Sequence, residues 1–144
     1  MLVAVGCSAT KDESGLKMED LVGEWENTSL EVKMNTFQNR DTTSYLSAPE
    51  GKWEEVLKIQ PIRTVYEADS TYTSLYKDLE GNPLGENKGT WFVRNDSLIL
   101  TANDVEYTYA VEFAESKARF VSLQDWDQDG QADDLYDGWQ KRIK

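Results

Sequence analysis

Apolar and polar side chains alternate with a period of two along residues 107–113. In the run YTYAVEF, one face collects the side chains of Tyr107, Tyr109, Val111 and Phe113. Successive side chains of a β-strand point to opposite faces of its sheet. This run therefore predicts a strand with one buried face, and we expect those four side chains to point into the interior.

Segments with strand-like composition recur along the chain, separated by Asn, Asp, Gly and Pro. They cover residues 23–34, 53–59, 63–68, 71–78, 89–93, 96–102, 118–124 and 134–143. Asn95 with Asp96, and Glu115 with Ser116, predict tight turns between neighbouring strands. We expect one helical turn at residues 16–21 and a polar surface loop at residues 35–51. The pattern predicts eight or nine antiparallel strands in a meander.

A meander of this size hides its edge strands most easily by closing into a barrel. About eight strands leave an interior for one small ligand or for packed side chains. We therefore predict an all-β, antiparallel up-and-down barrel over residues 21–144, with a partly open barrel or a sandwich as the alternative. The chain shows no internal repeat, no heptad pattern and no second domain.

Charge and composition narrow the classes of function. The 144 residues carry a net charge of −12, which disfavours binding to nucleic acid. There is no His and one Cys, so the usual zinc ligands and a Cys–His dyad are absent from the sequence. No apolar run approaches the roughly 20 residues that a membrane-spanning helix needs. Since no nucleophile–base pair or catalytic cofactor motif is present, we predict that the protein is not an enzyme.

The first residues indicate where the protein is located rather than how it folds. Leu2 to Val5 are apolar and precede Gly6 and Cys7, a segment that resembles the lipobox of bacterial lipoproteins. The following residues 11–13, Lys-Asp-Glu, resemble the export tag of surface lipoproteins of Bacteroidetes. The resemblance implies that residues 1–20 are a truncated signal peptide and flexible tether. The alternative is a frayed terminus with an incidental thiol.

A lipidated Cys7 would be the only contact with a membrane, because the acyl chains supply the anchoring free energy. The expected location is the bacterial cell envelope. The domain would be anchored at the outer membrane and would face either the periplasm or the cell exterior.

A second resemblance concerns the barrel. Gly23 and Trp25 match the glycine-x-tryptophan signature of lipocalins, and the runs GTWFVRNDSLILT and YTYAVEF look like small lipocalin-like domains of Bacteroidetes lipoproteins. The similarity spans residues 21–143, although no helix is expected after the last strand. It implies that Arg142 stacks on Trp25 and closes the barrel base by a cation–π contact. Apart from this role, Trp25, Trp91 and Trp139 are expected in the core.

The run DWDQDGQADD follows the order of calcium-binding loops. Its expected ligands are the carboxylates of Asp125, Asp127, Asp129 and Asp133 and the backbone carbonyl of Gln131. Tyr136 stands where such loops carry a bidentate Glu, and Asp134 or Asp137 would have to replace it. We expect weak Ca²⁺ binding, with a dissociation constant of about 10⁻⁴ to 10⁻³ M and a structural role. The alternative is a solvated turn without an ion.

Two functions from different classes follow. The first is a membrane-anchored lipocalin-like lipoprotein that binds a small apolar or aromatic ligand on its inner face, without catalysis. The second is a structural or interaction lipoprotein with a filled barrel, acting as an accessory subunit of a cell-surface complex. The partner is accordingly a small ligand or a cell-surface protein, and we expect a monomer. The volume of the barrel interior distinguishes the two functions.

Overall fold

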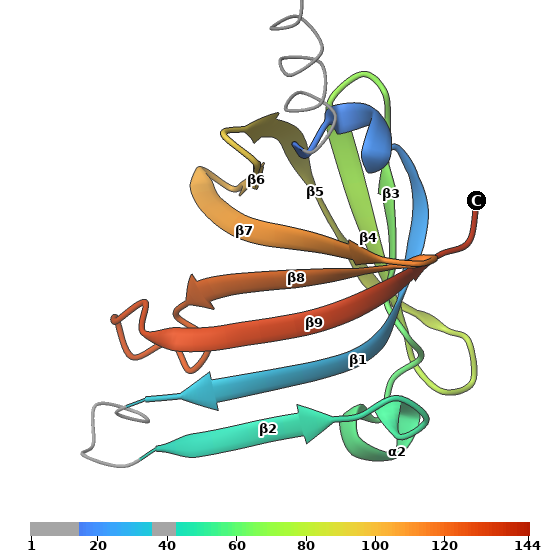
Figure 1. Ribbon diagram of the computed structural model, residues 1–144. Helices are drawn as coiled ribbons and strands as arrows, with labels where there is room; N and C mark the ends of the chain where they lie inside the picture. Colours follow the sequence, from blue (N-terminus) through green and yellow to red (C-terminus); the bar gives the residue numbers. More distant parts are fainter. Residues whose placement is uncertain (1–14, 36–42) are drawn as a thin grey trace, which may run out of the picture.

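A single antiparallel sheet of nine strands organises the computed structural model, which describes residues 15–35 and 43–144 (Figure 1). A short 3₁₀-helix, η1 (Met18–Asp20), precedes the sheet, and one short helix, α2 (Trp53–Leu57), interrupts it. The strands are β1 (Gly23–Met34), β2 (Ser44–Ala48), β3 (Arg63–Tyr66), β4 (Thr71–Lys77), β5 (Pro83–Arg94), β6 (Ser97–Ala102), β7 (Val105–Ala114), β8 (Lys117–Gln124) and β9 (Asp134–Arg142).

The sheet closes into a barrel because its last strand pairs with its first. β9 runs antiparallel to β1, from the pair Trp25 and Arg142 to the pair Met34 and Asp134. From β3 to β9 each strand pairs with the next, and the start of β1 completes the ring against β3. The predicted eight-stranded meander barrel is therefore confirmed, and the sheet is closed rather than partly open.

The ninth strand, β2, lies outside this ring. It pairs with residues 30–34 of β1, whereas β3 pairs with residues 23–26 of the same strand. Between these two stretches the β1–β9 register shifts at a bulge between Asn27 and Ser29. A bulge increases the local twist and bends a strand. As a result β3 and β2 pair with different parts of β1, on the same side of that strand, and point away from each other. The helix α2 lies in the connection between β2 and β3 (Figure 1).

The tight turns follow the sequence. Asn95 and Asp96, between β5 and β6, have φ angles of 52° and 64°, and Asn103 and Asp104, between β6 and β7, have 53° and 65°. Two-residue hairpin loops of type I′ need positive φ at both central positions, and Asn and Asp tolerate it. The predicted hairpin at residues 95 and 96 is confirmed, as is the helical turn, which forms η1.

The prediction of a strand at residues 53–59 is wrong, because this segment contains α2. Its apolar residues Trp53, Val56 and Leu57 are spaced by three and four positions, which is a helical period. Trp53 is buried, and two glutamates occupy the first turn, where the helix dipole favours negative charge. Lys58 ends the helix in a left-handed conformation.

The prediction of an irregular loop at residues 35–51 is also wrong in part, because residues 44–48 form β2. On the inward face of this strand Ala48 is buried and Ser44 and Leu46 are half-buried, while Tyr45 is 70 % exposed. An edge strand with one short buried face carries few apolar residues. Its polar composition therefore hid it from the sequence analysis.

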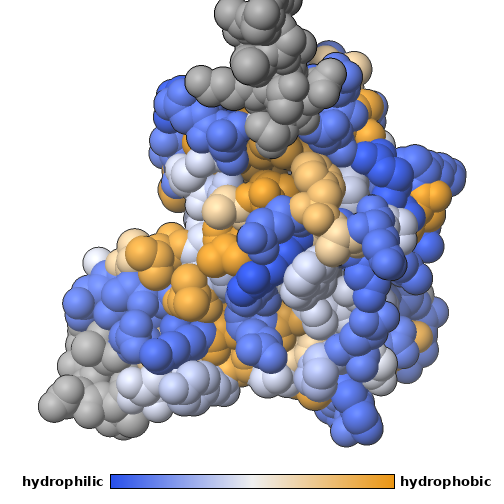
Figure 2. Space-filling view, viewed as in Figure 1, coloured by the Kyte–Doolittle hydropathy of each residue, from blue (hydrophilic) through white to orange (hydrophobic). Residues whose placement is uncertain are grey.

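Two apolar clusters fill parts of the interior. The first surrounds Trp25, Trp91 and Phe120 in the barrel, and the second joins Leu30, β2 and α2. The rings of Trp25 and Phe120 meet edge to face, with centroids 6.4 Å apart. Trp139, expected in the core, is half-buried instead and lines a hollow that also contains Arg119. Figure 2 shows hydrophilic side chains over much of one face, with apolar ones gathered over its middle.

The barrel base contains the contact that the lipocalin resemblance implied. The Arg142 guanidinium lies 4.5 Å from the centroid of the Trp25 ring and donates hydrogen bonds to the backbone carbonyls of Val22, at 2.8 Å, and Asp20. The indole of Trp25 donates to the carbonyl of Leu21. Gly23 has a φ of 137°, and a Cβ there would lie 2.6 Å from the Arg142 Nη1 atom. Gly23 thus makes room for the arginine.

Replacing Arg142 by Ala should lower the free energy of unfolding by about 1–2 kcal/mol, because one cation–π contact and two charged hydrogen bonds are lost. Lys141→Ala, at the neighbouring exposed position, should cost less than about 0.5 kcal/mol, since the Lys141 ammonium is half-exposed and Glu26 keeps its ion pair with Arg63. Urea unfolding monitored by tryptophan fluorescence measures both. Equal losses in the two variants would show that the base contact has no special role.

Candidate ligand-binding cavity

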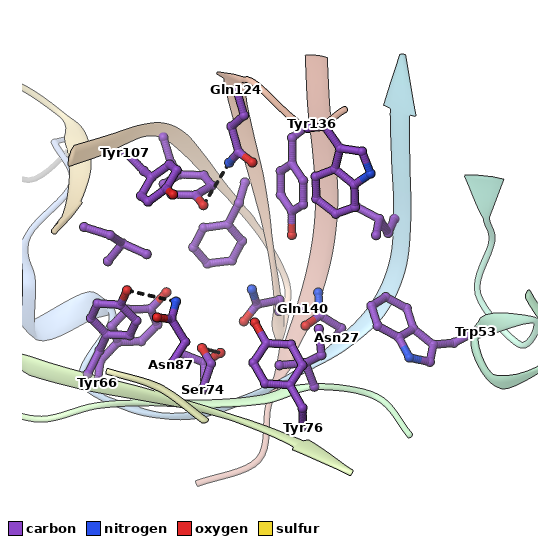
Figure 3. Close-up of a pocket in the computed structure, with 18 residues that line it drawn as sticks. Asn27, Trp53, Tyr66, Ser74, Tyr76, Asn87, Tyr107, Gln124, Tyr136 and Gln140 are labelled. Atoms are coloured by element: carbon purple, nitrogen blue, oxygen red, sulfur yellow. Dashed lines mark hydrogen bonds between the residues drawn. The ribbon is translucent and has the colours of Figure 1, made fainter. Parts of the chain in front are cut away.

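A cavity of about 270 Å³ lies inside the barrel, between the two apolar clusters. Eighteen residues line it, and they come from α2, from the connection between α2 and β3, from the β8–β9 loop and from the barrel strands (Figure 3). Tyr136 of β9 packs against both clusters and so marks the boundary at which the cavity opens.

Aromatic side chains form half of the wall. The lining includes six tyrosines, two tryptophans and one phenylalanine: Tyr66, Tyr72, Tyr76, Tyr107, Tyr109, Tyr136, Trp53, Trp126 and Phe120. Their rings hold one another in place. Tyr136 meets Tyr109 edge to face at 6.0 Å and lies 5.9 Å from Trp126, in a tilted arrangement. Such packing restricts the rings before any ligand arrives.

Amides and hydroxyls form most of the remaining wall. Asn27, Asn87, Gln124 and Gln140 supply the amides, and Thr64 and Ser74 supply the hydroxyls. Some of these groups pair with one another: the Gln124 amide donates to the Tyr109 hydroxyl at 3.0 Å, and the Thr64 and Ser74 hydroxyls lie 2.8 Å apart. These bonds fix the direction of the remaining polar groups in the cavity.

The wall is uncharged. None of the eighteen lining residues is Asp, Glu, Lys, Arg or His, although 29% of the sequence is charged. Burial raises the pKa of Tyr66, Tyr72, Tyr76 and Tyr109, and raises that of Tyr136 to about 12. These phenols therefore stay neutral at physiological pH.

Two buried polar atoms of the wall have no partner among the residues that the structure describes. They are the side-chain carbonyl oxygen of Gln140 and the indole nitrogen of Trp53. Gln140 is 7 % exposed and Trp53 is 4 % exposed, so water has little access to either side chain. An unsatisfied buried polar group costs about 1–3 kcal/mol. Two such groups destabilise the fold, and both line the same cavity.

Gly138 leaves room for the ring of Tyr136, which lines the cavity. Both residues belong to the inward face of β9, and a Cβ at Gly138 would lie 2.8 Å from the Tyr136 hydroxyl oxygen. The phenol therefore lies over the bare backbone of Gly138. Glycine within a strand interior otherwise weakens it, so close approach of another group is its reason here.

The four residues predicted to face a ligand separate into two groups. Tyr107 and Tyr109 line the central cavity, whereas Val111 and Phe113 line a second, more open hollow at the barrel base, together with Trp25 and Arg142. β7 is ten residues long, so its inner face spans both levels. Phe113 is 45 % exposed at the lower end.

The amides of the cavity wall were not predicted from the sequence. Asn27 and Gln140 are paired across β1 and β9, at inward positions where the alternation leads one to expect apolar side chains. Polar residues at core-facing positions are a signal of function when their strands are known. Both polar residues are visible in the sequence of β1 and β9. The bulge after Asn27, however, shifts the alternation of inward and outward side chains in β1.

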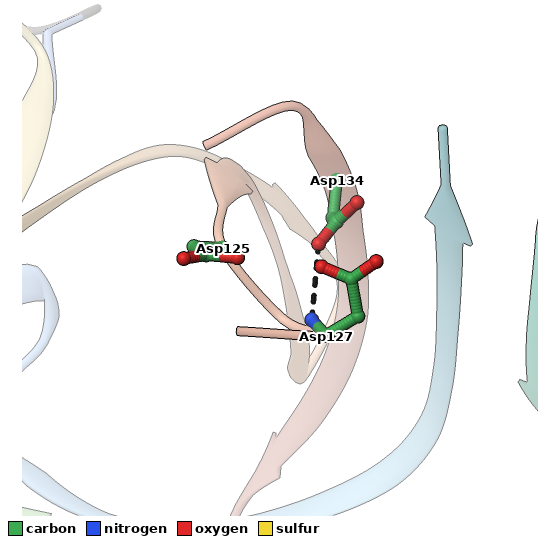
Figure 4. Close-up of side chains that lie close together, drawn as sticks. All are labelled: Asp125, Asp127 and Asp134. Atoms are coloured by element: carbon green, nitrogen blue, oxygen red, sulfur yellow. Dashed lines mark hydrogen bonds between the residues drawn. The ribbon is translucent and has the colours of Figure 1, made fainter. Parts of the chain in front are cut away.

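An acidic trio lies at the end of the barrel where β8 passes to β9 (Figure 4). One carboxylate oxygen from each of Asp125, Asp127 and Asp134 lies within 4.8 Å of the others. Asp134 is fully buried, and its Oδ2 atom accepts hydrogen bonds from the backbone N–H groups of Trp126 and Asp127. Burial raises its pKa.

The trio differs from the predicted calcium ligands. The structure brings Asp125 and Asp127 together with Asp134, while Asp129, Gln131 and Asp133 lie outside this group. The Asp129 carboxylate accepts a hydrogen bond from the backbone N–H of Gln131 at 2.9 Å. Asp125 likewise accepts from the backbone of Asp129 and of Gly130, so the loop carboxylates cap their own turn.

Cys7, the expected lipid attachment point, lies outside the described residues. Within residues 15–35 and 43–144, no helix is long and apolar enough to span a bilayer. Comparison with models of protein families finds no match, and a search of curated proteins finds no relative. The geometry therefore carries the functional argument.

The phenol of Tyr136 should ionise near pH 12, because burial favours its neutral form and raises its pKa. The difference in absorbance at ~295 nm between wild type and Tyr136→Phe should have its midpoint near pH 12. Since the folded state holds the phenolic protons more tightly, the contribution of the buried phenols to the free energy of unfolding should be constant below about pH 10 and fall as the pH rises above it. Circular dichroism recorded in parallel follows the unfolding. A difference midpoint near pH 10 in folded protein would place the phenol in water.

Proposed function

We propose that this protein is a lipocalin-like module that binds one small ligand inside its barrel. The observation that carries the proposal is the central cavity, which packed side chains leave open between the two apolar clusters. A filled barrel, as the interaction hypothesis requires, would lack this space. The aromatic wall and the convergent amides are typical of a small-molecule site.

The role is one of binding rather than catalysis. Supporting this, the wall holds no carboxylate, amine, imidazole or thiol among the residues that the structure describes. The tyrosine phenols are poor acids and bases at neutral pH because burial raises the pKa of several of them. We place the domain in the bacterial cell envelope as a monomer, anchored at the outer membrane by lipidated Cys7. This placement rests on the sequence resemblance.

We also propose that the acidic trio holds a calcium ion with a structural role. Two oxygens that bind one Ca²⁺ at about 2.3–2.6 Å lie at most about 5 Å apart, and the trio meets this limit. The second carboxylate oxygen of Asp134 is buried and accepts no hydrogen bond from the described residues. An ion there would stabilise the ionised form of Asp134, which burial disfavours.

At about 10 mM, Ca²⁺ should raise the free energy of unfolding by about 1.4 kcal/mol if the dissociation constant is near 1 mM. Asp134→Asn should abolish this gain, because it removes the buried charge while its carbonyl can still accept the two backbone hydrogen bonds. Asp129→Asn is the matched control and should keep the gain. The gain should also fade in acid, where Asp134 is protonated.

Thermal unfolding with and without Ca²⁺ measures the effect. Loss of the gain in Asp129→Asn but not in Asp134→Asn would favour the ligands that the sequence predicted. No gain in the wild-type protein would leave the loop as a turn without an ion.

The ligand proposal predicts that the domain, purified without denaturant from its source cells, carries a small-molecule adduct in a native mass spectrum. Ser74→Leu should lose the adduct, because it fills the cavity beside Thr64. Thr73→Leu adds the same side chain on the opposite face of β4 and should keep it. An adduct that survives Ser74→Leu would lie elsewhere. The proposal is contradicted if the wild-type protein has no adduct and also binds none of 2-naphthamide, 2-acetylnaphthalene and 2-naphthoate.

A further inference from the structure

We propose that the cavity selects an uncharged, flat compound that carries both a hydrogen-bond donor and an acceptor, which Gln140 and Trp53 recognise. This inference rests on the proposed function and names the ligand class of the same cavity. It differs from the sequence expectation of an apolar ligand, because it makes polar recognition inside the barrel the basis of selection.

The first step concerns charge. The protein surface is strongly acidic, with a net charge of −12, yet the eighteen residues around the cavity carry none. An ion that entered would lose its hydration without meeting a counter-charge. The surrounding negative charge would also repel an anion such as a fatty acid. The wall therefore excludes anions and accepts neutral ligands.

The second step concerns Gln140. Its neighbour across the β1–β9 pair is Asn27, and both amides line the cavity (Figure 3). The Gln140 carbonyl oxygen is buried and accepts no hydrogen bond from the part of the chain that the structure describes. A purely apolar ligand would leave this oxygen unpaired and even less hydrated. A ligand N–H or O–H group would satisfy it.

The third step compares three buried tryptophans. The Trp25 indole N–H donates to the Leu21 carbonyl at 2.9 Å, and that of Trp91 donates to the Glu67 carbonyl at 3.0 Å. Trp53 is as deeply buried, but its indole N–H has no acceptor among the described residues. It is also the one of the three that lines the cavity. A carbonyl, hydroxyl or ring nitrogen of the ligand would serve as its acceptor.

The fourth step concerns size and shape. At a packing density of about 0.74, a cavity of about 270 Å³ holds a ligand of roughly 200 Å³, which suits one or two fused rings. The walls offer aromatic faces, including Trp126 and Tyr136, against which a flat molecule can stack. In Figure 3, Gln140, Asn27 and Trp53 follow one another from the centre of the cavity to one side.

Three compounds of nearly equal shape test the inference by isothermal titration. 2-Naphthamide is neutral and has a donor and an acceptor, 2-acetylnaphthalene is neutral and has only the acceptor, and 2-naphthoate is an anion. We expect the amide to bind about tenfold more tightly than the ketone, since one hydrogen bond is lost. The carboxylate should bind at least about a hundredfold more weakly than the amide.

Two variants and one control assign the recognition to residues. Gln140→Met has similar length but no carbonyl, so it should bind the amide and the ketone equally; it should also fold, because it removes an unsatisfied buried oxygen. Lys141→Met, the next residue on the opposite face of β9, should keep the tenfold preference. Trp53→Phe identifies the Trp53 indole signal in a ¹H–¹⁵N spectrum and should weaken amide binding about tenfold.

The spectrum also reports the hydrogen bond directly. On addition of 2-naphthamide, the Trp53 indole proton should move downfield, while those of Trp25 and Trp91, already hydrogen-bonded, should not. Equal binding of the amide and the carboxylate, a tenfold preference that persists in Gln140→Met, or an unmoved Trp53 signal would overturn the inference. In those cases the proposed function stands as long as a compound binds in the cavity. Failure of all three to bind would overturn the inference, and failure of all three together with the absence of a native adduct would also overturn the proposed function.

Discussion

The pairing of β1 with β9 is the constraint on which the rest of the structure depends. It joins the two ends of the meander, removes the open edges of the barrel and brings Arg142 over Trp25. The same pairing contains the bulge after Asn27, at which β1 changes its neighbour from β3 to β2. The closed base and the diverging upper part are therefore two consequences of one strand pair. The cavity lies where the two parts meet.

The barrel interior has two layers. An apolar core stabilises the fold, and a polar layer above it contains groups, unpaired within the described part of the chain, that destabilise the fold. Around Trp25, Trp91 and Phe120 the side chains are apolar and pack on one another, which supplies most of the favourable burial. Above them, amides and phenols replace apolar groups, and two polar atoms of the cavity wall, one amide oxygen and one indole nitrogen, lack partners among the described residues. Such a level is retained in a small domain only if it serves something other than stability. Binding a ligand with polar groups of its own is a direct explanation.

The acidic loop and the cavity are physically connected. The Asp134 carboxylate accepts a hydrogen bond from the backbone N–H of Trp126, whose ring forms part of the cavity wall and lies against Tyr136. The negative charge of the protein is thus collected on its surface and in this loop, while the cavity beside it stays neutral. The surface charge keeps the protein soluble, whereas the neutral cavity wall determines which ligands can bind.

The sequence by itself determined the class of fold and most of its strands, because alternation with a period of two and turn residues such as Asn95 and Asp96 are local signals. It failed at residues 53–57, where the helical spacing of the apolar residues covers only five positions, and at β2, whose inward face has only two apolar residues. Only the tertiary structure decided which inward residues share a level of the barrel. It placed Tyr107 in the cavity and Phe113 at the base, and it brought Gln140 and Trp53 to the same cavity. The physical reason is that strand register, the β1 bulge and the docking of α2 are non-local, and no local pattern of residues encodes them.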